Sequence, residues 1–482
     1  MEDAPDSEGL RRRFGGSAAA ILFVGCLLWP LDLPADQHRL LAILLAVVAL
    51  WVSEALPIPV TALLIAPAMV AAGITDAKTA FAPYAAPLLF LFYGSFFIAM
   101  ALQRHGLDRR LAQALVSSPL VDGVPWRTRA AMMVAGMMLS MWISNTASTA
   151  ILVPILLATL GGGALTGMSD DGKRIATTGG LLAIAYACSM GGMGTLVGTP
   201  PNLITVGLLA EVGIELTFFE WASIGVPTAV ALVLVIYLVF ARRYPPPPAP
   251  ARAEQTEFGP LSRGELVTAL SFVLAITGWV VPGVLKALGT ESAPLVAKAL
   301  PAGGVAILAA SVLFAVRDER GKPVLPWPEA RNIDWGLIML FGGGISLGGQ
   351  MFKTGLAKTL GQGFIELTGV SDMWTLTAVA IAFTIFFTEV CSNTATSSMV
   401  VPLIIGVATE LGISPVPPAL GVGLAASCAF MMPIATGPNA IVYGTGEIAL
   451  PDMIRIGTLL NVLGGIVIFI MLRILCPLYG WT

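Results

Sequence analysis

The sequence predicts an all-α protein that crosses a membrane many times, and three observations support this prediction. Of its 482 residues, 56% are hydrophobic and only 11% are charged, whereas soluble domains carry about 25% charged residues. The mean hydropathy is +0.85. Apolar runs of about 18 or more residues recur, which is the length of helix that spans a bilayer. We therefore expect about eleven spanning helices, and also two interrupted apolar segments that enter and leave on one side as re-entrant hairpins.

In order along the chain, these runs define five parts. A polar tail at 1–16 carries three arginines, which favour a retained first span at 17–37 over a cleaved signal peptide. A first half at 38–241 is joined to a second half at 264–482 by a Pro-rich linker at 242–263. Within the halves we expect uninterrupted spans at 38–54, 58–74, 85–103, 220–241, 264–286, 295–316, 334–353 and 453–477, hairpins at about 128–163 and 374–410, and broken spans at about 175–210 and 416–447.

Lysine and arginine are distributed unevenly across this map. With the N-terminus in the cytoplasm and both interrupted segments treated as hairpins, 19 of the 26 lysines and arginines fall on the cytoplasmic side, as the positive-inside rule predicts. The bias weakens if the interrupted segments cross fully. We therefore expect a multi-pass protein of the inner (plasma) membrane with a cytoplasmic N-terminus.

The two halves carry matching motifs in the same order. Residues 92–111 resemble 341–360, the tripeptide S-N-T at Ser144 recurs at Ser392, and G-T-P-P-N from Gly198 has a counterpart in A-T-G-P-N from Ala435. An odd number of expected spans separates the copies, so the second half is inverted in the membrane. Inverted repeats with broken helices are typical of secondary transporters.

The motifs are suited to holding ions at the middle of the membrane. Short hydroxyl and amide side chains at a hairpin tip can end one helix and cap the next, and proline breaks the helix in each second motif. Exposed helix N-termini favour anions, and freed carbonyls favour cations. No Lys, Arg or His lies between Ala130 and Met168 or between Asp372 and Gly444. A dianion bound there would therefore need a co-bound hard cation such as sodium.

Other readings of the sequence are less favoured. No basic patch indicates nucleic acid, and two histidines and five scattered cysteines give no pattern for a metal site or a disulfide framework. No nucleophile–base pair supports an enzyme. The glycines at 342–344 are expected to serve close helix packing rather than phosphate binding. Glu54 is expected at the end of a span, and Glu389 is either a hydrogen-bonded scaffold or a coupling residue.

At these motifs the chain resembles the divalent anion/sodium symporter (DASS) family, which includes bacterial INDY-like dicarboxylate transporters and mammalian sodium-coupled citrate carriers. The paired S-N-T motifs are typical of that family. The segment 426–442 also looks like its sodium/sulfate symporter signature, with every fixed position filled. One departure is Gly437, where many relatives carry a second proline.

The resemblance implies a scaffold domain, a transport domain and a homodimer that works by an elevator motion. It implies that the transport domain contains the hairpins, the broken helices and the spans that follow them. It also implies that the substrate is held by Ser144, Asn145, Thr146, Thr199, Ser392, Asn393, Thr394 and Thr436. The residues that match its sodium sites are Ser140, Ser144, Asn145 and Gly198 in the first half, and Thr388, Cys391, Asn393 and Ala435 in the second, where Cys391 and Ala435 offer only carbonyls.

The hydroxyls of Ser140 and Thr388 lie one helical turn before each S-N-T, and they favour sodium coupling. We therefore expect sodium-coupled symport of C4-dicarboxylates such as succinate, malate or fumarate. A sodium-independent dicarboxylate exchanger and a citrate, tartrate or sulfate carrier of the same family remain alternatives. An ion channel is a further alternative, which saturable flux with counterflow would exclude.

Overall fold

The computed structural model describes residues 7–121, 123–246 and 259–482, and in these residues the regular structure is helical. The all-α fold class is therefore confirmed. Residues 1–6 of the expected tail and 247–258 of the expected linker lie outside the described residues. The helices are α1 Ser7–Leu28, α2 Ala35–Ser53, α3 Ile58–Ala71, α4 Ala77–Phe81, α5 Leu89–Arg104, α6 Leu107–Val116, α7 Pro125–Ser140, α8 Asn145–Thr159, α9 Asp170–Gly192, α10 Pro200–Ala210, α11 Phe218–Arg243, α12 Arg263–Ala287, α13 Ala293–Ala299, α14 Ala302–Ala315, α15 Trp327–Ala330, α16 Trp335–Thr354, α17 Leu356–Thr368, α18 Met373–Thr388, α19 Asn393–Glu410, α20 Val416–Ala425, α21 Gly437–Tyr443 and α22 Leu450–Leu475.

Among the described residues, seven helices are long and apolar enough to cross a membrane, or up to nine if each of two bent pairs counts as one span. The count of about eleven spans stays a prediction. The first helix begins at Ser7, earlier than the span expected from residue 17. The run expected as one span at 295–316 is two helices bent by 53°, because Pro301 stands between them and stops the first.

The sequence repeat corresponds to a structural repeat. Helix α5 of the first half packs against α14 of the second half, and α16 of the second half packs against α3 of the first half. Both contacts depend on glycine. A methyl group added at Gly94 would lie 2.4 Å from the backbone of Ala306, and one added at Gly343 would lie 2.4 Å from the backbone of Ala62. This close approach confirms that the glycine run at 342–344 serves helix packing.

A short helix follows each of these two helices: α6 follows α5, and α17 follows α16. The apolar runs alone did not predict these short helices as separate elements. Gly106 and Gly355 mark these two turns with positive φ values of 70° and 80°, a conformation that glycine adopts at little cost. The chain thereby turns sharply at the same place in both halves. Glu54 has a left-handed conformation and ends α2, which confirms its expected place at the end of a span.

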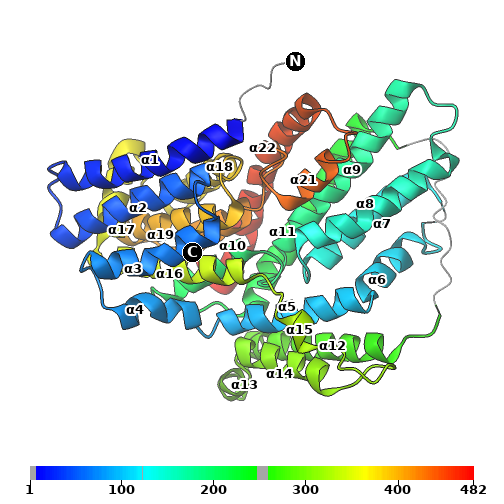
Figure 1. Cartoon of the computed structure of the whole chain (residues 1–482), viewed down its shortest axis with the longest axis horizontal. Coiled ribbons are helices and arrows are strands. Elements are labelled where there is room, and N and C mark those ends of the chain that lie inside the picture. Colours follow the sequence, from blue (N-terminus) through cyan, green and yellow to red (C-terminus); the bar gives the residue numbers. More distant parts are fainter. Residues whose placement is uncertain (1–6, 122, 247–258) are drawn as a thin grey trace.

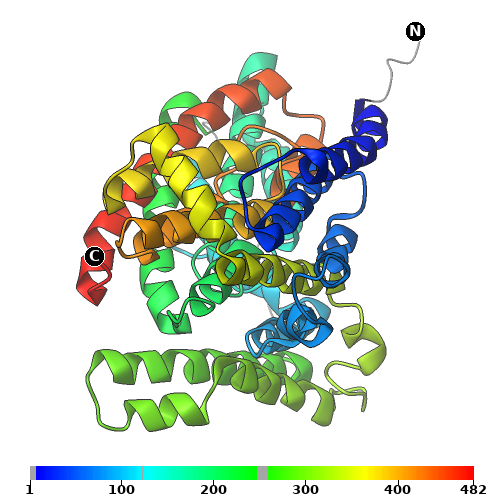
Figure 2. The ribbon, with the colours of Figure 1, turned by 90° about the vertical axis from the view of Figure 1, so that its left-hand side faces the viewer.

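The two helix–break–helix elements, α7–α8 and α18–α19, approach the centre from opposite sides, as Figure 1 shows with the first in cyan and the second in yellow to orange. Each packs against a broken helix of the other half: α8 contacts α21, and α19 contacts α10. The helices α12 to α14, green along the bottom of Figure 2, form a layer against α5 and α11. The fold therefore places each helix–break–helix element beside a broken helix of the other half.

Candidate functional site

Each S-N-T motif begins a helix after a break of four residues. Ser144 and Ser392 are the N-caps of α8 and α19, and their hydroxyl oxygens accept hydrogen bonds of 3.2 Å from the backbone N–H groups of Ala147 and Ala395. A serine in this position satisfies one of the free N–H groups of the first helical turn. The remaining N–H groups give each tip a partial positive charge.

A hydroxyl–asparagine pair stands at each tip. The Ser140 hydroxyl donates to Asn145 Oδ1 at 2.5 Å, and the Thr388 hydroxyl donates to Asn393 Oδ1 at 2.8 Å. Thr388 also lies 3.0 Å from the carbonyl oxygen of Ala426. Each pair therefore gathers two or three oxygen atoms, the ligand type that sodium prefers. In the described residues neither asparagine Nδ2 has a protein acceptor, so both can donate to an anion.

Two further asparagines form hydrogen bonds across the breaks in the broken helices. Asn202 Nδ2 donates to the carbonyls of residues ten and seven positions earlier, Gly192 at 2.9 Å and Thr195 at 2.6 Å. Asn439 Nδ2 donates at the same spacings to Ala429 at 2.9 Å and Met432 at 3.0 Å. These two asparagines end the G-T-P-P-N and A-T-G-P-N motifs, and no role was predicted for either side chain from the sequence. Because an asparagine ends both copies of the motif, the repeat itself could have indicated that these side chains have a role.

The first set of expected sodium ligands lies around one glycine. A methyl group added at Gly192 would lie 2.4 Å from Asn145 Oδ1, and one added at Gly198 would lie 2.4 Å from the Gly192 carbonyl oxygen. Ser140, Asn145 and Gly198 are thus brought together, with Ser144 adjacent in the chain. Only a residue without a side chain allows these three segments to approach so closely.

The second set of expected sodium ligands is joined less directly. Thr388 and Asn393 are hydrogen bonded, and the Cys391 side chain is buried at 6% exposure. Ala435 donates its N–H to the Met432 carbonyl at 3.2 Å, the same carbonyl that Asn439 holds. Ala435 therefore belongs to the unwound segment that follows α20.

Thr146 connects the first tip to the second half. A methyl group added at Gly437 would lie 2.1 Å from Thr146 Oγ1, so the threonine occupies the space that any side chain at 437 would need. Gly437 is the first residue of α21, and its neighbour Thr436 is the N-cap, which accepts from the Asn439 N–H at 3.3 Å. Thr199 is the equivalent N-cap of α10, and it is buried, as is Thr394 in α19.

Glu389 has a structural position in the second break. Its carboxylate accepts hydrogen bonds from the backbone N–H groups of Phe430 at 2.8 Å, Met431 at 2.8 Å and Met432 at 3.0 Å, and from Asn461 Nδ2 at 2.7 Å. Four donors to one carboxylate favour the scaffold role over the coupling role. The first half has no such group, because Met141 stands at the matching position.

A cavity of about 320 Å³ reaches the first tip. It touches Ser144, Gly198 and Pro200, and its other walls come from α5 and from the segment that leads into α16. This volume lies within the range of about 300–1,000 Å³ that is typical of small-molecule sites. Its lining residues are Phe92, Ser95, Phe96, Ala99, Met100, Gln103, Trp142, Ile143, Ser144, Val197, Gly198, Pro200, Asn332, Ile333, Asp334 and Leu337.

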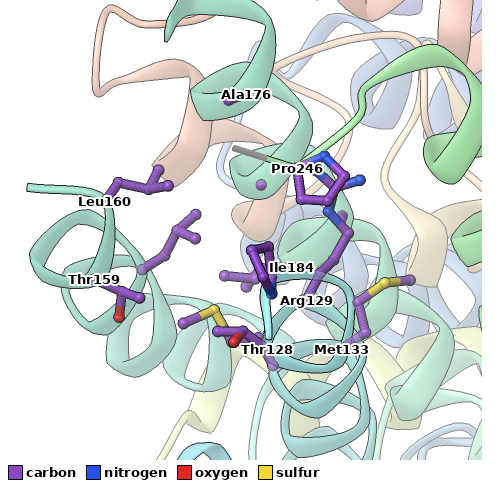
Figure 3. Close-up of a pocket in the computed structure, with 13 residues that line it drawn as sticks. Thr128, Arg129, Met133, Thr159, Leu160, Ala176, Ile184 and Pro246 are labelled. Atoms are coloured by element: carbon purple, nitrogen blue, oxygen red, sulfur yellow. The ribbon is translucent and has the colours of Figure 1, made fainter. Parts of the chain in front are cut away.

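A second, narrow cavity of about 30 Å³ lies at the far end of α7 and α8. Figure 3 shows the Arg129 side chain pointing toward Pro246, with Thr159 and Leu160 across from it. Arg129 is 7% exposed and donates to the carbonyl oxygens of Phe240, at 3.3 Å, and Tyr244. At about 10–15 Å³ for one water, the cavity has room for two or three waters at most and is too small for a dianion. Arg129 instead holds the end of α11 against α7.

Comparison with known proteins gives four findings. Residues 16–481 match the family described as sodium:sulfate symporter transmembrane region. An uncharacterized transporter of Haemophilus influenzae is 33% identical over 437 residues, 89% of each chain. The sodium-dependent dicarboxylate transporters SdcS of Staphylococcus saprophyticus and Staphylococcus aureus are each 31% identical, over 95% of this chain and 90% of their own. The crystal structure of the Alcanivorax borkumensis YdaH transporter has a TM-score of 0.55 at 15% identity, covers 83% of this chain and 88% of its own, and supports the fold alone.

Proposed function

The chain belongs to the sodium:sulfate symporter (DASS) family of membrane transporters, and from that premise we propose that it moves C4-dicarboxylates such as succinate, malate or fumarate together with sodium. The protein is a multi-pass membrane transporter and not an enzyme, and its family and relatives imply sodium as the coupling ion. The C4-dicarboxylate substrate and the elevator motion are parts of the proposal. The two hydroxyl–asparagine pairs at the S-N-T tips are the observation that carries it.

Sodium binds first in this scheme. The cation takes Asn145 Oδ1 and the Ser140 oxygen at one tip, with Ser144 and the Gly198 segment close by. It takes Asn393 Oδ1 and the Thr388 oxygen at the other. Binding replaces the hydrogen bond between each hydroxyl and its asparagine. Each amide is then fixed with its Nδ2 toward the space between the tips.

The substrate carboxylates are then held by the tips. Donors are the amide groups of Asn145 and Asn393, the hydroxyls of the S-N-T residues, and the free N–H groups of α8 and α19. The N-terminal threonines of α10 and α21, Thr199 and Thr436, complete this set. Because no Lys, Arg or His lies between Ala130 and Met168 or between Asp372 and Gly444, sodium must supply most of the positive charge. Substrate and cation binding are coupled for that reason.

Movement is proposed for a transport domain of α7–α11 and α18–α22 against a scaffold of the remaining helices, in a homodimer of the plasma membrane with a cytoplasmic N-terminus. Support comes from the packing of α8 on α21, α19 on α10 and α11 on α22, which joins the two halves of this domain. The cavity beside Ser144 lies between this domain and α5 of the scaffold. It provides a path for the substrate on one side of the membrane.

Uptake of radiolabelled succinate into proteoliposomes tests the proposal. A sodium gradient should drive saturable uptake, and an equal potassium gradient should not. Asn145→Ala and Asn393→Ala should each abolish uptake while the protein remains folded in the membrane. Equal uptake in sodium and potassium would support an exchanger instead, and retained uptake in both variants would remove the site assignment.

The hydroxyls are tested separately from the asparagines. Ser140→Ala and Thr388→Val should raise the sodium concentration for half-maximal uptake. Ser311→Ala and Thr458→Val remove hydroxyls that bond only to their own helices, and these matched variants should behave as the wild type. An unchanged sodium dependence in Ser140→Ala and Thr388→Val would exclude both hydroxyls from the cation sites.

A further inference from the structure

A charged pocket of about 240 Å³ lies where α11 ends and α22 begins. Both helices belong to segments long and apolar enough to cross the membrane, and they pack against each other. Their adjoining ends therefore lie where the hydrocarbon region of the bilayer meets its headgroups. The residues that line this α11–α22 pocket are Arg243, Tyr244, Asp452, Arg455, Ile456 and Leu459.

The wall formed by Tyr244 is held in place by the interior of the protein. The buried Arg129 of α7 donates a hydrogen bond to the Tyr244 carbonyl oxygen. A methyl group added at Gly179 of α9 would lie 2.3 Å from Tyr244 Cβ, so the tyrosine packs directly on that glycine. The end of α11 is thus fixed against α7 and α9, and the pocket has a defined wall.

Positive charge is in excess around the pocket. The carboxylate of Asp452 is paired with Arg174 of α9 at 3.1 Å. In the described part of the chain, the side chains of Arg243 and Arg455 form neither a salt bridge nor a hydrogen bond. The charges of all four residues act on the Tyr244 side chain, so they surround one point. Three arginines and one aspartate leave a net charge of +2 there.

The pocket continues into an apolar stripe on α22. Leu459 lines the pocket and is 37% exposed, and Val462 and Ile466 are each 51% exposed. Residues three and four positions apart lie on one face of a helix, so these three side chains form a continuous row. Because α22 crosses the membrane, the row meets lipid hydrocarbon. A ligand with a charged head and an apolar chain matches this arrangement.

We propose that the α11–α22 pocket binds the phosphate group of an anionic phospholipid, with an acyl chain along the Leu459 row. The guanidinium groups of Arg243 and Arg455 donate to the phosphate oxygens, since arginine binds phosphate through charge-assisted and often paired hydrogen bonds. Basic pockets between spanning helices are suited to lipid headgroups. In a zwitterionic lipid the ammonium group offsets the phosphate charge, so such a lipid binds more weakly.

The bound lipid joins the two halves of the protein, because α11 belongs to the first half and α22 to the second. It supplies the negative charge that the described residues do not place beside Arg243 and Arg455. We therefore expect binding to stabilise the folded protein. This effect requires neither sodium nor substrate, so it is independent of the proposed transport function.

Native mass spectrometry of the full chain in detergent tests the binding. Phosphatidylglycerol should bind at least about fivefold more tightly than phosphatidylcholine of the same chain length. Arg243→Gln and Arg455→Gln should each weaken phosphatidylglycerol binding by about fivefold, the usual effect of one basic residue beside an anionic lipid. Equal binding of the two lipids by the wild type would overturn the proposal.

A neighbouring arginine provides the matched control. Arg242 lies in the same last turn of α11, is exposed and does not line the pocket. Arg242→Gln should weaken phosphatidylglycerol binding by no more than about twofold, because salt screens a charge outside the pocket. Equal weakening in Arg242→Gln, Arg243→Gln and Arg455→Gln would show a diffuse attraction to positive charge and would refute the pocket.

Thermal unfolding separates a lipid from a soluble phosphate. Phosphatidylglycerol should raise the unfolding temperature of the wild type and of Arg242→Gln, and it should have little effect on the double variant R243Q/R455Q. Inorganic phosphate should give no comparable rise, because it has no chain to cover the Leu459 row. An equal rise with inorganic phosphate would assign the pocket to a soluble anion and overturn the lipid. Loss of sodium-driven uptake in the wild type would refute the proposed function and leave these results unchanged.

Discussion

Replacing Glu389 tests whether its carboxylate holds the unwound segment of the second broken helix. Glu389→Met introduces the residue that stands at the matching place in the first half, Met141. It removes the acceptor for three backbone N–H groups and for Asn461 Nδ2. Met431 and Met432 are half-buried, so water can reach their N–H groups, but Phe430 and Asn461 are each 1% exposed.

The magnitude follows from those two buried donors. Each unpaired buried donor costs about 1–3 kcal/mol, so Glu389→Met should lower the free energy of unfolding by about 2–6 kcal/mol. Glu389→Gln keeps one oxygen and places its amide nitrogen against the Met432 N–H. We therefore expect a smaller loss of about 1–3 kcal/mol for this variant. The expected order of stability is wild type, then Gln, then Met.

Thermal unfolding of the purified protein, followed with and without sodium, measures both effects. The stabilisation by sodium should decrease in Glu389→Gln, because the segment leading to Ala435 is held less firmly. Glu366→Gln, at an exposed glutamate of α17, is the matched control and should unfold as the wild type. A Glu389→Met protein as stable as the wild type would refute the reasoning about the loop.

Three more predictions concern other contacts. Gly437→Ala should raise the KM for succinate several-fold, because its methyl group displaces Thr146, and uptake kinetics measure it. Asn202→Ala and Asn439→Ala should each lower stability by about 1–3 kcal/mol in thermal unfolding, since each loses two hydrogen bonds of about 0.5–1.5 kcal/mol. Arg129→Gln should lower stability by about 2 kcal/mol, the effect of a cation at a helix C-terminus, and leave the sodium dependence of uptake unchanged.

Each of these has a matched control elsewhere in the chain. Gly363→Ala adds a methyl group where nothing lies within 4 Å, and Asn332→Ala removes an exposed amide with one contact, at 3.2 Å. Arg242→Gln changes an exposed arginine that donates at 3.5 Å to its own helix. An unaltered KM in Gly437→Ala would mean that Thr146 can move freely. If Asn202→Ala and Asn439→Ala lowered the free energy of unfolding by different amounts, the two copies of the motif would not contribute equally to stability.

Much of the fold could be predicted because membrane helices are constrained by length and hydropathy. The breaks after Ser140 and Thr388 lie inside the predicted hairpins, since short polar residues inside long apolar runs indicate interruptions. The turns at Gly106 and Gly355 were visible only as aligned residues of a repeat. Their positive φ values and the short helices that follow depend on the packing of each half, which hydropathy does not encode.

The site was predicted in its residue types and not in its contacts. The spacing in the sequence predicted a hydroxyl side chain one helical turn before each S-N-T, because residues one turn apart in a helix are also close together in the chain. By contrast, the four donors around Glu389 and the place of Thr146 against Gly437 join segments that are distant in the chain or cross the halves.

The sequence by itself therefore determined the all-α membrane class, the duplicated motifs and the lack of fixed positive charge around the two hairpin tips. Composition and local spacing are sufficient for these, because helices in lipid satisfy their own backbone groups. Only the tertiary structure decided that Glu389 is a loop-holding group, that Gly437 makes room for Thr146, and that Asn461 turns an unpaired oxygen away from Glu389. Those features depend on distances between segments far apart in sequence, and such distances arise only when the helices pack together.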